Sequence, residues 1–319
     1  MRLSFSGLGL ITLVVSGFFI WSLDAHFSSG PMKSDSTIII PVGVGLSEIT
    51  EILTEKGILD QPFVFKLAAK LSGKSKTLHA GEYFLKAHSS QDEVLEMLFK
   101  GDIVLRKITI PEGLTSLQIV KKLNLIEGLV GKILQRPLEG TLLPETYKYI
   151  FGDTRESIVI RMQKEMAAFV QKEWEKRHLN LPFKSMEEAI ILASIIEKET
   201  GLASERRLVA SVFINRLNGK MKLQSDPTVR YGVPSLSNKK RLTHRDLKRQ
   251  TKHNTYKITG LPPTPICNPG KASIIAALTP ANTNFFYFVA NGTGGHFFSK
   301  TLKEHNKYVA RWRKIKKRP

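Results

Sequence analysis

Residues 190–200 read IILASIIEKET, an apolar run that ends in two carboxylates. A helix begins just upstream, because Ser185 and Glu188 form the Ser-x-x-Glu pattern of a capping box. Gly201 is placed to end that helix. Between these signals the segment is apolar on nearly every face, so the sequence predicts a buried helix. A carboxylate at the end of a buried helix costs free energy unless it is paired, protonated or open to a cleft, and a carboxyl of raised pKa in a cleft suits acid–base chemistry.

Two carboxylates, Glu197 and Glu199, stand at this helix end. Two residues apart on a regular helix, they lie on roughly opposite faces and cannot both point into one cleft. One can be an acid while the other pairs with Lys198, Arg206 or Arg207. The spacing does not choose between them, and two surface glutamates at a frayed helix end are the simpler alternative.

The composition narrows the class of protein. The chain has 319 residues and a net charge of +20, which fits an anionic polymer, a membrane surface or a basic solvated surface. No nucleic-acid-binding motif accompanies the charge, so we expect no nucleic acid partner. The single cysteine, Cys267, excludes a disulfide within the chain. Since His296 and His305 lack a metal-ligand spacing, we expect neither a metal nor a cofactor.

The N-terminus predicts a membrane anchor. Residues 7–23 carry no charge and are rich in Leu, Val, Ile and Phe, with Trp21 near the far end. Arg2 lies before the run, which favours an inside amino end and an exported remainder. A cleaved signal peptide is the alternative, but residues 24–26 (Asp-Ala-His) make a poor cleavage site.

An internal repeat follows the anchor. Residues 38–43 (IIIPVG) and 108–113 (ITIPEG) each lead from a short strand through a turn into a helical pattern. We expect the two copies to pair in one small α+β module. The predicted organisation is a cytoplasmic stub and transmembrane helix at 1–24, a linker at 25–36, the βα module at 37–150 and a mixed domain at 151–319. The fold class is α+β.

Polar turns downstream fit sugar binding. Residues 223–228 (LQSDPT) contain Gln224 and Asp226, and residues 254–256 (NTY) contain Asn254 and Tyr256. Amides, carboxylates and an aromatic hydroxyl are usual groups for holding sugars, although turns attract such residues for other reasons too.

The sequence resembles the MltG (YceG-like) family of membrane-anchored endolytic murein transglycosylases over most of its length. The resemblance is carried by short motifs in a fixed order. They are LASIIEKET (192–200), ASER (203–206), VASVFINRL (209–217), LQSDPT (223–228), NTY (254–256), GLPP (260–263), GGH (294–296) and EHN (304–306).

The resemblance implies an activity and a site. The implied reaction is cleavage of the β-1,4 bond between N-acetylmuramic acid and N-acetylglucosamine in peptidoglycan strands, leaving a 1,6-anhydro end and terminating strand elongation. It implies a LysM-like N-terminal module, an inner-membrane location with the catalytic domain in the periplasm, and peptidoglycan synthases (penicillin-binding proteins) as partners. The implied catalytic residue is Glu199, with Glu197 supporting it. We assign substrate binding to Gln224, Asp226, Asn254 and Tyr256.

Two departures from the family pattern and three alternative functions remain. His253 stands where relatives usually carry tyrosine, and residues 139–143 (EGTLL), in an expected lip or hinge at 138–147, replace bulkier aromatics of some relatives. One alternative is a muramidase-type hydrolase with Asp226 as second carboxylate. A non-catalytic peptidoglycan-binding scaffold is another. A nucleic-acid protein is the third and requires a cytoplasmic location.

Overall fold

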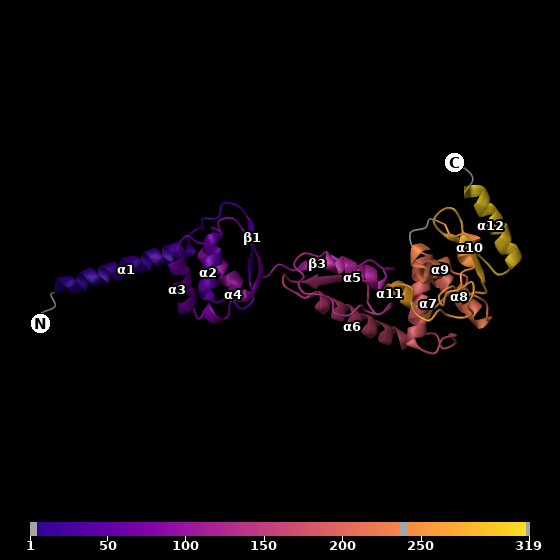
Figure 1. Cartoon of the computed structure of the whole chain (residues 1–319). Coiled ribbons are helices and arrows are strands. Elements are labelled where there is room, and N and C mark those ends of the chain that lie inside the picture. Colours follow the sequence, from indigo (N-terminus) through magenta and orange to yellow (C-terminus); the bar gives the residue numbers. More distant parts are fainter. Residues whose placement is uncertain (1–4, 237–240, 317–319) are drawn as a thin grey trace. The chain divides into compact units, whose positions relative to one another are not determined.

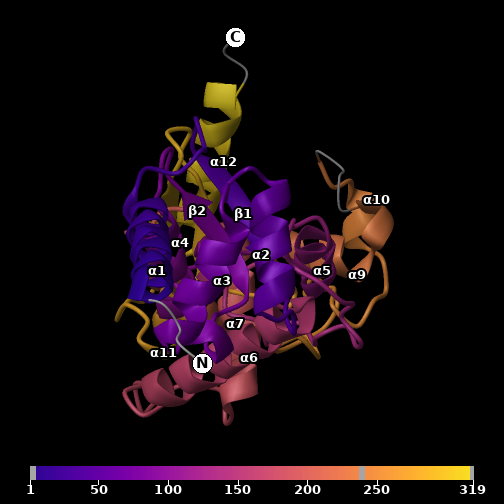
Figure 2. The same cartoon turned by 90° about the vertical axis from the view of Figure 1, so that its left-hand side faces the viewer.

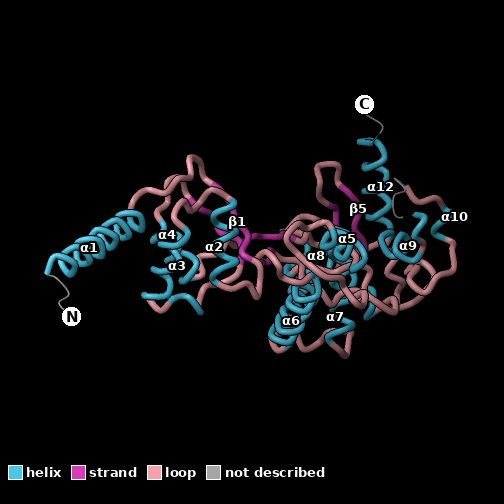
Figure 3. The backbone as a smooth tube through the Cα atoms, turned by 60° about the vertical axis from the view of Figure 1, so that its left-hand side comes forward, coloured by secondary structure: helices cyan, strands magenta, loops and turns pink. Residues whose placement is uncertain are grey.

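A computed structural model of the chain describes residues 5–236 and 241–316. The fold is mixed α+β, as the sequence predicts, with short strands among many helices (Figures 1 and 3). The chain forms two compact units. Unit 1 comprises Met1–Lys107 and Lys148–Asp153, and unit 2 comprises Ile108–Tyr147 and Thr154–Pro319.

Unit 1 packs helices against a two-stranded antiparallel sheet (Figure 2). Ile38 pairs with Tyr83 across that sheet, and both are buried. Helix α3 begins at Pro62, which lacks an amide N–H and suits the first helical position. The elements are α1 (Phe5–Phe27), β1 (Ser36–Ile40), α2 (Leu46–Glu55), α3 (Pro62–Leu71), η1 (Lys74–Lys76), β2 (Gly81–Leu85) and α4 (Gln91–Lys100).

The N-terminal apolar run forms α1, which contacts α3 and α4 of the same unit. Among the residues that the structure describes, no helix combines the length and the apolar character needed to cross a membrane.

The two repeat copies do not share a sheet, contrary to the sequence prediction. β1, from the first copy, pairs with β2, whereas β3 (Arg106–Thr109), from the second copy, pairs with β4 (Thr146–Tyr149). Each copy therefore finds its partner strand further along the chain. Similar local patterns predict similar strands but do not determine which strands pair.

Unit 2 is built around α7 (Met186–Glu199), which contacts α6, α8, α9 and α11. Its apolar middle is buried on almost every face, as the sequence predicts. The β5–β6 hairpin packs on α12. The remaining elements are α5 (Ser116–Asn124), α6 (Arg155–Trp174), α8 (Arg206–Asn218), α9 (Asp226–Gly232), η2 (Pro234–Leu236), α10 (His244–Leu247), α11 (Lys271–Leu278), β5 (Tyr287–Ala290), β6 (His296–Ser299) and α12 (Leu302–Lys316).

Residues 108–147 belong with unit 2, whereas the sequence places a single boundary at 150. One physical reason is the side chain of Asn268, which is fully buried. Its Nδ2 donates to the Leu114 carbonyl and to Ser116 Oγ, both at 3.1 Å. Its Oδ1 accepts from the Leu142 amide at 3.0 Å. The Asn268 side chain thus joins three points of the 108–147 segment to the rest of unit 2.

The segment at 138–147, which the sequence predicts as a lip or hinge, is exposed at Leu138 and Thr146. It is irregular up to Glu145, as its glycine and proline content predicts. However, Leu142 and Leu143 are only 0% and 1% exposed. The middle of the segment is therefore buried within unit 2, where Leu143 belongs to the hydrophobic core.

Candidate active site

Helix α7 presents Glu199 as its last residue. At its start, Ser185 Oγ accepts from the Glu188 amide at 3.3 Å, which is half of the predicted capping box. The Glu188 carboxylate instead accepts from the Lys184 amide at 2.6 Å. The helix ends because Thr200 is extended, with φ −141°. Gly201 follows the helix but does not provide a left-handed cap.

The carboxyl group of Glu199 lies next to the hydroxyl group of Ser225. Ser225 Oγ donates to Glu199 Oε1 at 2.5 Å. Burial raises the pKa of Glu199 to about 7, because the ionised form is poorly solvated there. The Ser225 hydrogen bond and the charge of Arg216 oppose the rise in pKa, whereas the nearby Asp226 adds to it. Near neutral pH this carboxyl can therefore both give and take a proton.

Two polar motifs hold Ser225 in place. The Ser225 amide donates to Thr255 Oγ1 at 2.9 Å. Thr228 Oγ1 donates to the Ser225 carbonyl at 2.6 Å and lies 2.9 Å from Thr255 Oγ1. The preceding residue, Gln224, has a φ of 53°, which few non-glycine residues adopt. The LQSDPT and NTY motifs thus form one hydrogen-bonded cradle beside Glu199.

Asp226 and Tyr256 are brought together at this cradle. The Tyr256 hydroxyl donates to Asp226 Oδ1 at 2.8 Å. Burial raises the pKa of Tyr256, and the Asp226 charge raises it further. Gln224 and Asp226 are exposed, so both can reach a molecule in solvent.

Asn254, predicted to bind substrate, is fully buried. Its Nδ2 donates to the carbonyls of Leu247 and Arg249 at 3.0 and 2.6 Å. Its Oδ1 accepts from the Tyr256 amide at 3.0 Å. The side chain is occupied by its own loop, and it positions Tyr256.

Glu197 faces away from Glu199, as helix geometry predicts. Its Oε2 accepts from the amide of Gly270, the N-cap of α11, at 3.0 Å. Its Oε1 lies 3.9 Å from Arg206 Nη2, which also approaches the carboxylate of Glu112 at 3.5 Å. Glu197 therefore ties the end of α7 to the start of α11.

Arg216, for which the sequence predicts no role, lies close to this site. It is 8% exposed in the last turn of α8. Its Nε donates to the Phe286 carbonyl at 2.7 Å and its Nη1 to the Leu223 carbonyl at 2.8 Å. The only signal in the sequence is a charge within the apolar run VASVFINRL.

Three histidines, His253, His296 and His305, have structural partners. His253 Nε2 lies 2.9 Å from Thr264 Oγ1. His296 Nδ1 lies 2.7 Å from Glu205 Oε2. The His305 ring stacks on Tyr287, with 5.2 Å between centroids.

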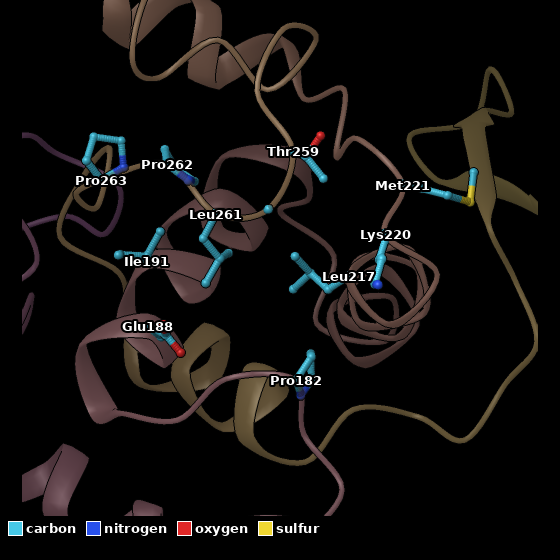
Figure 4. Close-up of a pocket in the computed structure, with 11 residues that line it drawn as sticks. Pro182, Glu188, Ile191, Leu217, Lys220, Met221, Thr259, Leu261, Pro262 and Pro263 are labelled. Carbon is cyan, nitrogen blue, oxygen red and sulfur yellow. The ribbon is translucent and has the colours of Figure 1, made fainter.

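A cavity of about 580 Å³ lies at the other end of α7 (Figure 4). Leu217 and Leu261 point toward its centre, and Glu188 and Ile191 line it from α7. Glu199 does not line it. At about 1.5 Å of rise per residue, Ile191 lies about 12 Å along the helix from Glu199. We place the chemistry at Glu199, because the cavity brings together no comparable set of polar groups.

Replacing Ser225 with alanine should raise the pKa of Glu199 above its present value. The lost O–H donor favours the ionised carboxylate, so its removal favours the protonated form. A carbon NMR titration of the labelled Glu199 carboxyl measures this. The control is Ser211→Ala, since the Ser211 hydroxyl pairs with Thr283. An unchanged titration in Ser225→Ala would contradict the assignment.

The YceG-like family model matches residues 38–311 of the chain. The endolytic murein transglycosylase of Bacillus subtilis (strain 168) is 33% identical over 92% of this chain and 90% of its own length. That of Streptococcus pneumoniae serotype 2 is 28% identical over 87% of this chain, which spans 58% of the pneumococcal protein.

A solved structure agrees with these matches. The crystal structure of a YceG-like protein from Listeria monocytogenes is 34% identical and superposes with a TM-score of 0.53. The match covers 86% of this chain and 99% of that one. With a family match across most of its length and a relative at 33% identity over 92% of it, the chain belongs to the YceG-like family.

Proposed function

We propose that this protein is an endolytic lytic transglycosylase that cleaves the glycan strands of peptidoglycan. The names of its relatives support this activity. The observation that carries the proposal is the partly buried carboxyl of Glu199, with a pKa of about 7 and a hydrogen bond from Ser225. A carboxyl group with that pKa can act as an acid and then as a base near neutral pH.

The reaction requires only this carboxyl. Protonated Glu199 donates its proton to the oxygen of the β-1,4 bond between N-acetylmuramic acid and N-acetylglucosamine, and the C1–O bond breaks. The Glu199 carboxylate then takes the proton of the muramic C6 hydroxyl, whose oxygen bonds to C1. The products are a strand with a free 4-hydroxyl and a strand with a 1,6-anhydro end. Intramolecular attack gains from proximity, and no water is consumed.

The neighbouring residues take different roles in this proposal. We assign sugar binding to Gln224, Asp226 and Tyr256. Their polar groups lie around Ser225, which contacts the catalytic Glu199. Asn254 and Glu197 position the site from behind, since their polar atoms are engaged within the protein.

A muramidase-type hydrolase is the competing activity, with Asp226 as second carboxylate. Most glycosidases need two carboxyl groups across the scissile bond. Asp226 already accepts a hydrogen bond from Tyr256 and is exposed, whereas Glu199 is only partly exposed. This difference favours a single catalytic carboxyl.

We further propose that residues 7–23 anchor the protein in the inner membrane and place the remaining chain in the periplasm. The support is the uncharged run with Trp21 near its end. A LysM-like role for the N-terminal module, and peptidoglycan synthases as partners, belong to the same proposal. A reporter fused at the carboxyl end, active only outside the cytoplasm, tests the orientation.

The deciding experiment is incubation of the detergent-solubilised full chain with uncrosslinked glycan strands, followed by mass spectrometry of the ends. A transglycosylase leaves 1,6-anhydro ends, lighter by one water than the reducing ends left by a hydrolase. Strands that are bound but remain uncut would indicate a scaffold protein.

The rate of cleavage should fall as the pH rises through about 7. Protonated Glu199 is the acid of the first step, and its pKa is about 7. A pH profile of kcat/KM on isolated strands measures this. If kcat/KM did not fall as the pH rose through about 7, another group would be the acid.

A further inference from the structure

We propose that Arg216 is a positioning residue for Glu199, because its guanidinium holds the loop that carries Ser225 and the start of β5 around the catalytic carboxyl. This inference rests on the proposed function. It adds to the reaction a residue that donates no proton and forms no covalent bond.

The hydrogen bonds of Arg216 join separate segments of unit 2. From α8, its Nη1 donates to the carbonyls of Lys222 and Leu223, at 3.3 and 2.8 Å, and approaches Gln224 Oε1 at 3.4 Å. Its Nε donates to the Phe286 carbonyl at 2.7 Å. Ser225 is the next residue after this loop, so the guanidinium fixes the entry to the residue that donates to Glu199.

An aromatic ring supports the guanidinium. Arg216 Cζ lies 5.3 Å from the centroid of the Tyr287 ring, and His305 stacks on that ring. Phe286 and Tyr287 are consecutive, so one stretch of chain supplies both a carbonyl acceptor and a ring. The planar fork of arginine can satisfy both at once, which a lysine ammonium cannot.

The charge of Arg216 also acts on Glu199. It favours the ionised carboxylate and so lowers the pKa of Glu199 against the effect of burial. Burial lowers the pKa of Arg216, whereas Tyr287, Tyr256 and Glu199 raise it. Asp226 and His305 are the other titratable groups that influence this pair. A carboxyl that must alternate between acid and base depends on this balance of burial and charge.

The test compares Arg216→Gln with Arg216→Lys in the full chain. The glutamine variant removes the charge and the fork, and we expect kcat to fall about 100-fold with little change in KM. Its alkaline limit of activity should move to higher pH. The Arg216 charge is lost and the Ser225 hydrogen bond is weakened, and both favour ionised Glu199. The lysine variant keeps the charge, so its limit should stay closer to wild type while kcat still falls.

The direction of the pH change separates positioning from general loosening. A loosened site admits water, which lowers the pKa of Glu199 and moves the alkaline limit to lower pH. An alkaline limit of activity that is unchanged, or that moves to lower pH, in Arg216→Gln would overturn the proposal. So would wild-type kcat in either variant.

The matched control is Arg207→Gln on the same helix. Arg207 is exposed and donates to the Thr279 carbonyl at 2.7 Å. We expect wild-type kcat and pH limit from this variant. A loss equal to that of Arg216→Gln would show that any arginine of α8 has the same effect, and would overturn the proposal.

A further variant covers the case in which the Arg216 variants do not fold. Tyr287→Leu removes the ring beneath the guanidinium and leaves its carbonyl acceptors in place. We expect a lower kcat with KM nearly unchanged, and full activity would overturn the proposal. If wild-type protein cuts no strands, the proposed function fails; the carbon NMR titration of Glu199 in Arg216→Gln then decides on Arg216 alone.

Discussion

Replacing Glu199 with glutamine should abolish strand cleavage while leaving the fold intact. Glutamine keeps the shape of the side chain and can still accept the Ser225 hydrogen bond. It can neither donate the proton to the glycosidic oxygen nor remove one from the C6 hydroxyl. Loss of one acid–base role costs about 100-fold to 10,000-fold, and Glu199 has both roles. We therefore expect a fall in kcat of at least about 10,000-fold.

The same substitution should stabilise the protein at alkaline pH. The folded-state pKa of Glu199 is raised from 4.5 to about 7, so the folded state binds the proton more tightly than the unfolded chain. Stability is therefore lost as the pH rises through this window, by on the order of 3 kcal/mol. Glutamine carries no charge at any pH and escapes this loss.

Thermal unfolding at about pH 9 and pH 4, together with end-group analysis, tests both parts. The variant should melt higher than wild type at the alkaline pH and near it at the acidic one. Glu187→Gln is the control, since Glu187 is an exposed carboxyl on the first turn of the same helix. Cleavage by Glu199→Gln would end the assignment, and equal melting at both pH values would contradict a buried, raised-pKa carboxyl.

Replacing Asn268 with alanine should be among the most destabilising single changes in unit 2. The substitution leaves the Leu142 amide, the Leu114 carbonyl and Ser116 Oγ without the Asn268 side chain in a buried site. A buried polar group without a partner costs about 1–3 kcal/mol. We expect the free energy of unfolding to fall by about 4 kcal/mol, with partial relaxation offsetting the rest.

Urea unfolding followed by circular dichroism measures the change. Asn306→Ala is the control because Asn306 is exposed on α12, and it should unfold with a midpoint near wild type. A loss below about 1 kcal/mol in Asn268→Ala would mean that water or neighbouring groups replace its hydrogen bonds. The segment 108–147 would then be held by other contacts.

Local signals in the sequence were enough for the central helix of unit 2. Ser185, the apolar run and the two glutamates predict α7. Helix periodicity also separated Glu197 from Glu199, whose partners lie on different sides of the helix. These features depend on residues within a few positions of one another.

Long-range relationships were beyond local reasoning. The repeat copies pair with different strands because pairing depends on the whole fold. Ser225 stood in a quoted motif, but only folding shows that its hydroxyl meets a carboxylate 26 positions away. Asn254 carries an amide of the kind that binds sugars, yet its side chain is buried within its own loop. Arg216 resembles a surface residue at a helix end until its carbonyl partners are known.

The boundary between the two units falls inside strands β3 and β4, and the chain passes it three times. A single proteolytic nick or truncation therefore cannot yield both units whole. A fragment that starts at residue 108 still carries residues 148–153 of the other unit, and one that ends at 107 lacks them. Gene fusions that exchange the whole of unit 1 would have to be spliced at three places, so this architecture favours inheritance of the two units together.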